Sequence, residues 1–162
     1  MRRCGRSART PSRQPGAGGA SLPGLTWTVL GAAGVFGALS GDAVNRLGLA
    51  WSWSIGMILL AGATLLLGSA AHVVVVGLVA AAVFGASYIA LTGVLLVWGT
   101  RLTSDHPSAG VTLGFLMIAV GQAAAAPATG AVADVADLQT AFLACSAVAV
   151  AGAVLRPGRV TI

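Results

Sequence analysis

Long apolar stretches alternate with short polar connections along most of the chain. Each stretch is continuously apolar and close to the roughly 20 residues that an α-helix needs to cross a 30 Å hydrocarbon layer. Membrane β-strands are only about ten residues long and alternate in polarity, which these stretches do not. The pattern predicts an all-α, polytopic membrane protein with about five transmembrane helices, over residues 25–41, 49–71, 73–100, 109–132 and 138–155.

Composition supports a membrane class. Of the 162 residues, 57% are hydrophobic and only 8% are charged, and the mean hydropathy is +0.92. A soluble domain has roughly 25% charged residues with which to cover its surface. We therefore expect a multi-pass protein of the cell (inner or plasma) membrane, with the lipid bilayer as its main partner.

The first 24 residues differ from the rest. They are rich in Arg, Ser, Gly and Pro and contain no acidic residue, a composition that predicts disorder. Five of the nine arginines lie among the first thirteen residues, without the basic stripe and interleaved aromatic residues of a nucleic-acid site. We expect a disordered tail over 1–24, a transmembrane domain over 25–162, and no nucleic-acid partner.

The remaining arginines predict the orientation of the helices. Arg46 follows the first apolar stretch, Arg101 the third, and Arg156 and Arg159 the fifth. Short connections make neighbouring helices antiparallel, so these arginines fall on one side, which the positive-inside rule assigns to the cytoplasm. The tail, with its five arginines, then falls outside. Either the tail overrides and distorts this topology, or the first two dozen residues did not evolve with the membrane domain; we favour the second interpretation.

Gly41–Gly48, with the sequence GDAVNRLG, separates the first two apolar stretches. We expect a short charged turn here. Asp42 and Arg46 stand four residues apart, the spacing at which side chains of opposite charge can pair on a helix.

Small residues recur at four-residue spacing within the stretches. Such faces allow close packing between helices in lipid. They are Ala33, Gly37 and Gly41; Gly77, Ala81 and Gly85; Gly110 and Gly114; and Gly121 and Ala125.

Polar residues inside the stretches are few, and they are the candidates for a substrate-binding cavity: Gln122, Tyr88 and Thr92. An amide in hydrocarbon needs hydrogen-bond partners. Gln122 can find them either in a polar cavity or on a neighbouring helix, and both interpretations stay open. Pro127 would loosen the helix just after Gln122.

Features of an enzyme are absent from the sequence pattern. No carboxylate or histidine lies within a stretch, and nothing resembles a nucleophile with its base, a phosphate-binding loop or a paired acid. Cys4 and Cys145 lack metal-ligand spacing. We expect no catalytic residues, no metal site and no cofactor.

GDAVNRLG resembles the G-x-x-x-D-R-x-G signature of major facilitator superfamily transporters. Gly41, Arg46 and Gly48 match, and Asn45 stands where the family has Asp. The stretch GFLMIAVGQAAAAPATGAVAD resembles the family's eleventh span and AFLACSAVAVAGAVL its twelfth. The order of the stretches is similar to that of spans 8–12 of the family. Within the family, the chain is most similar to the branch of YbfB/YjiJ-type permeases.

The resemblance implies a partial C-terminal bundle of a secondary transporter that moves a small solute between two helical bundles. It also implies a gating role for the signature residues, Gly41, Asp42, Asn45, Arg46 and Gly48, and an N-terminal half as a separate partner. Transport would then be the function of a longer protein, of which this chain is a truncated fragment. The alternative is a small non-transporting membrane protein that forms homo-oligomers through its small-residue faces.

Overall fold

The computed structural model describes residues 22–37, 40–70 and 73–155, and within these ranges the chain is helical, without a strand. The prediction of an all-α fold is confirmed. The helices are α1 (Leu22–Gly37), α2 (Ser40–Leu47), α3 (Leu49–Ala70), α4 (Val74–Leu102), α5 (Pro107–Val135) and α6 (Leu138–Val154). Helix α1 begins slightly before the predicted residue 25, and residues 1–21 of the predicted tail lie outside the described part.

Three helices, α3, α4 and α5, are long and apolar enough to cross a bilayer. Helix α6 is apolar but has 17 residues, and α1 has 16. At 1.5 Å per residue these two reach about 24–26 Å, short of a hydrocarbon layer of about 30 Å. The chain is thus a helical protein of membrane type, and the count of five spans remains a prediction.

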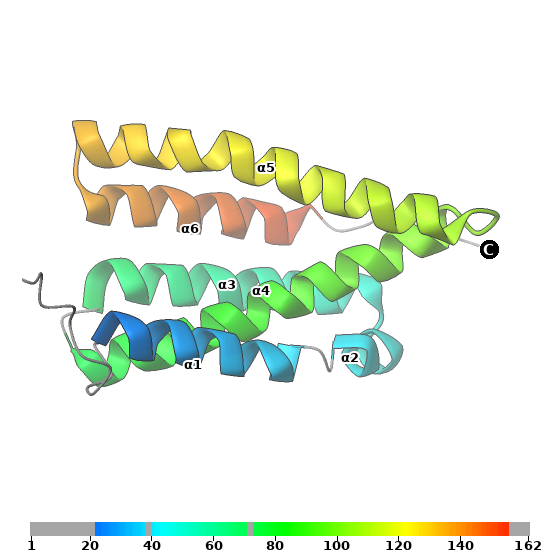
Figure 1. The fold of residues 1–162 in the computed structure, drawn as a ribbon, viewed down its shortest axis with the longest axis horizontal. Coiled ribbons are helices and arrows are strands. Elements are labelled where there is room, and N and C mark those ends of the chain that lie inside the picture. The colour runs from blue at the N-terminus through cyan, green and yellow to red at the C-terminus, as the bar shows by residue number, and fades with distance from the viewer. Residues whose placement is uncertain (1–21, 38–39, 71–72, 156–162) are drawn as a thin grey trace, which may run out of the picture.

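Helices α3, α4, α5 and α6 form a ring in which each contacts its two neighbours, and α1 lies along the outside of α4. Figure 1 shows α5 and α6 as one pair above α1, α3 and α4. The predicted hairpins are antiparallel, as Gly56 of α3 against Leu91 of α4 illustrates. Helix α1 runs parallel to α4, because Gly34 lies against Ile89 and Gly85 against Leu30.

These directions gather the arginines at one end of the bundle. Arg46 is in the last turn of α2 and Arg101 in the last turn of α4, and both segments lie at the same end in Figure 1. Asp134 and Asp137 lie at the opposite end, at the α5–α6 connection. Arg156 and Arg159 are outside the described residues. The described arginines and these two aspartates therefore lie at opposite ends of the bundle, as the arginine pattern predicts. The assignment of the arginine end to the cytoplasm remains a prediction.

The segment expected to be a charged turn is mostly helical. Ser40–Leu47 forms α2, with Val44 only 3% exposed and Asp42, Asn45 and Arg46 exposed. The turn is confined to Gly48, whose φ of +82° favours glycine and whose N–H donates to the Val44 carbonyl at 3.0 Å, a helix C-terminal cap. Asp42 and Arg46, both within the described part, form no ion pair.

Small side chains fill the interior and large apolar ones face outward. Ala80 and Ala81 are at most 1% exposed, whereas Trp27, Val75 and Val148 are at least 70% exposed. Water would disfavour such a surface, while lipid solvates it and leaves close packing of small residues to hold helices together. The burial pattern is therefore that of a protein surrounded by lipid.

Helices α3 and α6 are joined by side-chain hydrogen bonds to backbone carbonyls. Trp53 Nε1 donates to the Gly152 carbonyl at 3.0 Å, and Ser54 Oγ to that of Ala153 at 2.9 Å. Further along, Ser146 Oγ donates to the Ala61 carbonyl at 3.0 Å. Both serines are buried, so these bonds form where no water competes. They fix α6 along the length of α3.

The predicted small-residue faces pack helices at three points. Gly85 lies against the Leu30 backbone, Gly110 against the Gly99 backbone, and Gly114 against the Leu96 side chain. Beyond these contacts the face of α5 is open, because a Cβ at Gly121 would meet no atom within 4 Å and Ala125 is exposed.

Asp137 gives a pH-dependent start to α6. Its carboxylate accepts the Thr140 backbone N–H at 2.6 Å, which lowers the pKa of Asp137 below its ordinary 3.8. A lowered folded-state pKa contributes stability above the unfolded value that is lost as pH falls through the folded pKa. We expect Asp137→Ala to lower the thermal midpoint in detergent at neutral pH, and the gap to wild type to close below pH 3.8.

The matched control is Asp134→Ala, an exposed aspartate near the end of α5. A carboxylate at a helix C-terminus is not stabilised by the helix dipole, so this variant should not lower the midpoint. If the difference in thermal midpoint between wild type and Asp137→Ala stayed constant with pH, the ionised Asp137 carboxylate would not be what stabilises the start of α6.

Candidate functional site

Tyr88 and Gln122 meet between α4 and α5. Gln122 Nε2 donates to Tyr88 Oη at 2.6 Å. Tyr88 is half-buried and Gln122 is exposed. Of the two interpretations open for Gln122, the structure shows the hydrogen bond to a neighbouring helix.

The pair lies at mid-length of the two longest helices. Tyr88 is the central residue of α4 (Val74–Leu102), and Gln122 directly follows the central residue of α5 (Pro107–Val135). In a bilayer this depth is the most costly place for a polar group. The bond leaves the tyrosine hydroxyl proton as a donor and the amide oxygen of Gln122 as an acceptor.

Thr92, the third candidate, is used locally. Its Oγ1 donates to the Tyr88 carbonyl at 2.9 Å, one turn earlier on the same helix. Such a bond satisfies the hydroxyl within the helix. Thr92 therefore stands near Tyr88 but does not join the Tyr88–Gln122 bond.

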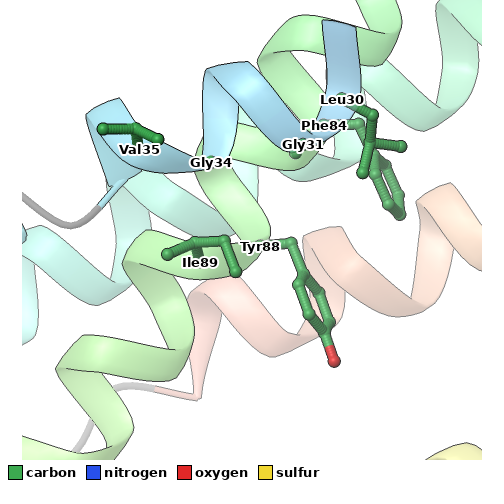
Figure 2. A pocket seen from close by; sticks show the side chains of 8 residues that line it. Leu30, Gly31, Gly34, Val35, Phe84, Tyr88 and Ile89 are labelled. Atoms are coloured by element: carbon green, nitrogen blue, oxygen red, sulfur yellow. The ribbon is translucent and has the colours of Figure 1, made fainter. Parts of the chain in front are cut away.

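Tyr88 also lines a groove between α1 and α4, shown in Figure 2. The groove has a volume of about 430 Å³, within the range of roughly 300–1,000 Å³ typical of small-molecule sites. No Asp, Glu, His, Lys or Arg is among the residues that line it, which are Leu30, Gly31, Gly34, Val35, Phe84, Gly85, Tyr88 and Ile89.

Glycines and two aromatic rings give the groove its shape. A Cβ at Gly31 would meet no atom within 4 Å, so this position leaves open space, whereas at Gly85 it would meet the Leu30 carbonyl. Phe84 and Tyr88, four residues apart, hold their rings nearly parallel, at 4° with centroids 6.4 Å apart. Figure 2 shows both rings on the same side of α4, with the Tyr88 hydroxyl directed away from α1.

The signature residues form a separate site. Helix α2 contacts α3 and α4 at the arginine end of the bundle, and Tyr88 lies about 21 Å along α4 from that end at 1.5 Å per residue. Asp42, Asn45, Arg46 and Gly48 are exposed there, and the surroundings of Gly41 are outside the description. The structure therefore does not bring the signature residues together with the cavity candidates Tyr88, Thr92 and Gln122.

The groove residues on α1 and Phe84 were not among the sequence candidates. The pairing of α1 with α4, two helices separated by α2 and α3 in the chain, could not be deduced from short connections. Two signals were available. Phe84 precedes Tyr88 by four residues, and an antiparallel hairpin with Gly110 against Gly99 brings Gln122 opposite Tyr88.

No group of three His, Cys, Asp or Glu side chains that could hold a metal gathers in the part of the chain that the structure describes. Fold and site together define a helical protein of membrane type, in which the Tyr88–Gln122 pair joins two helices long enough to span a bilayer and an apolar groove lies beside it. No known family model, no curated protein and no solved structure matches the chain.

Proposed function

We propose that this chain belongs to a secondary transporter of the major facilitator type, which moves a small solute across the cell membrane. The observation that carries the proposal is the Tyr88–Gln122 bond at mid-length of α4 and α5, beside a groove large enough for a small molecule. Polar groups at this depth are expensive, and in membrane proteins they mark solute pathways.

The packing of α4 on α5 suits a rocking movement. The backbones touch at Gly99 and Gly110, and from this crossing the helices diverge toward the opposite end (Figure 1). The Tyr88–Gln122 bond spans the widening part. A solute that takes over one hydrogen bond of this pair would release α5 from α4 while the glycine contact stays as the pivot.

Pro127 contributes to the same movement. It lies inside α5 and has no N–H, so the Ala123 carbonyl lacks its helical donor. The helix remains continuous but is weakened next to Gln122. At the arginine end, the exposed Asp42, Asn45 and Arg46 of α2 are free to act in gating, as the resemblance implies.

The test is solute flux through the purified full chain in liposomes. Uptake of radiolabelled neutral, anionic and cationic solutes is measured against protein-free liposomes. Transport predicts uptake of at least one solute that saturates with its concentration. Uptake that stays linear and equal to the protein-free control for every solute would contradict transport by this chain on its own.

A non-transporting oligomer is the second candidate, and the open face of α5 favours it. Among the three spanning helices α5 has the smallest buried share, and Gly121 and Ala125 lie on its uncovered part. Light scattering in mild detergent gives the mass of the complex. A stable oligomer that Gly121→Leu dissociates, without saturable flux, would favour this function over transport.

A further inference from the structure

We infer that the solute is a neutral, flat aromatic molecule with a hydrogen-bonding group at one edge. This inference rests on the proposed function, because it assigns the α1–α4 groove and the Tyr88–Gln122 pair as the solute site. The groove supplies the apolar wall, and the pair supplies the polar end.

The lack of charge in the groove selects a neutral solute. Its lining residues are apolar apart from Tyr88, whose hydroxyl is directed out of the groove (Figure 2), and the described arginines lie at the end of the bundle. An ion that entered would lose its hydration without a countercharge, which costs far more than apolar contacts return. Anionic and cationic solutes are therefore disfavoured.

The aromatic wall selects a flat solute. The parallel rings of Phe84 and Tyr88 line the groove, and aromatic rings favour contact with another ring in offset or edge-to-face geometry. On the α1 side, Gly31 leaves the space of a side chain empty. A groove lined by two aromatic rings and by glycines accepts a thin ring system better than a bulky branched one.

The Tyr88–Gln122 pair favours a solute with a hydrogen-bonding group at one edge. The Tyr88 hydroxyl is directed out of the groove (Figure 2) and keeps one donor after it accepts from Gln122. In the part that the structure describes, no second hydrogen bond involves the Gln122 side chain. A hydroxyl group on the solute can accept from Tyr88 and donate to Gln122.

Binding of four naphthalene probes to the full chain in phosphatidylcholine nanodiscs tests the inference. The probes are 2-naphthol, naphthalene, naphthalene-2-sulfonate and naphthalen-2-ylmethylammonium, measured by equilibrium dialysis with empty nanodiscs subtracted. We expect saturable binding of 2-naphthol, weaker binding of naphthalene, and binding of both ions at least about tenfold weaker than that of 2-naphthol. Equal affinity for an ion and 2-naphthol would overturn the inference.

Gly31→Leu places a side chain in the groove and should weaken 2-naphthol binding at least about tenfold. Gly62→Leu on α3 is the matched control, because a Cβ at either glycine meets no atom within 4 Å; it should bind as wild type does. Unchanged binding by Gly31→Leu, or no saturable binding because lipid chains fill the groove, would overturn the inference.

These outcomes are separable from the transport test. Selective 2-naphthol binding without flux of any solute would contradict transport and leave the ligand class standing. Saturable flux of charged solutes alone would leave transport standing and contradict the ligand class.

Discussion

Gly110→Ala is expected to destabilise the folded chain by about 1–3 kcal/mol, the range for forced overpacking. A Cβ at Gly110 would collide with the Gly99 carbonyl and with Thr103 Oγ1. The carbonyl belongs to helix α4 and also accepts the Thr103 backbone N–H at 3.2 Å, so it cannot turn aside without breaking that bond. Unfolding by SDS titration, followed by circular dichroism, measures the loss.

Gly121→Ala on the same helix is the matched control. A Cβ there meets no atom within 4 Å, and alanine is the better helix former by up to about 1 kcal/mol. The control should therefore be neutral or slightly stabilising, opposite in sign to Gly110→Ala. Equal effects of the two substitutions would show that α4 and α5 do not touch at Gly99 and Gly110.

The apolar pattern was enough to predict the long helices. Stretches expected over 49–71, 73–100 and 109–132 are found as α3, α4 and α5 with ends displaced by at most a few residues. The ends follow local signals that a sequence displays, such as Pro107 at the start of α5 and Asp137 as the cap of α6.

The conformation of GDAVNRLG was harder to predict because glycine and polar residues suggest a turn. The buried Val44 anchors the segment, and the exposed Asp42, Asn45 and Arg46 lie on the same helix of eight residues. Only Gly48 needs a positive φ. Within the motif, the turn between α2 and α3 therefore depends on the glycine at its end and not on its charges.

The candidate site was predictable in part. Gln122 and Tyr88 stood out because amides and phenols are rare in apolar stretches, but choosing between a cavity and a partner helix required knowing which faces of α4 and α5 meet. The groove depends on α1 lying parallel to α4, a contact between segments that are not neighbours in the chain. Only tertiary packing determines such a contact.

Gln122→Leu is expected to reduce saturable flux at least about tenfold while changing stability by only about 0.6 kcal/mol, the average for a hydrogen bond between membrane helices. The leucine removes the donor to Tyr88 Oη and the acceptor proposed for the solute. An exposed side chain at this position leaves no cavity when replaced. Initial uptake rates and SDS unfolding measure the two effects.

Gln139→Leu, an exposed glutamine in the first turn of α6, is the matched control and should transport as wild type does. Tyr88→Phe and the double variant complete a cycle in which the stability effects of the two residues should couple by well under about 2 kcal/mol. A coupling above that value with flux unchanged would make the Tyr88–Gln122 bond a structural link. Weak coupling together with lost flux would support the proposal that the solute replaces one partner of the Tyr88–Gln122 hydrogen bond during transport. Only a bond that is easily broken can be replaced in this way at each cycle.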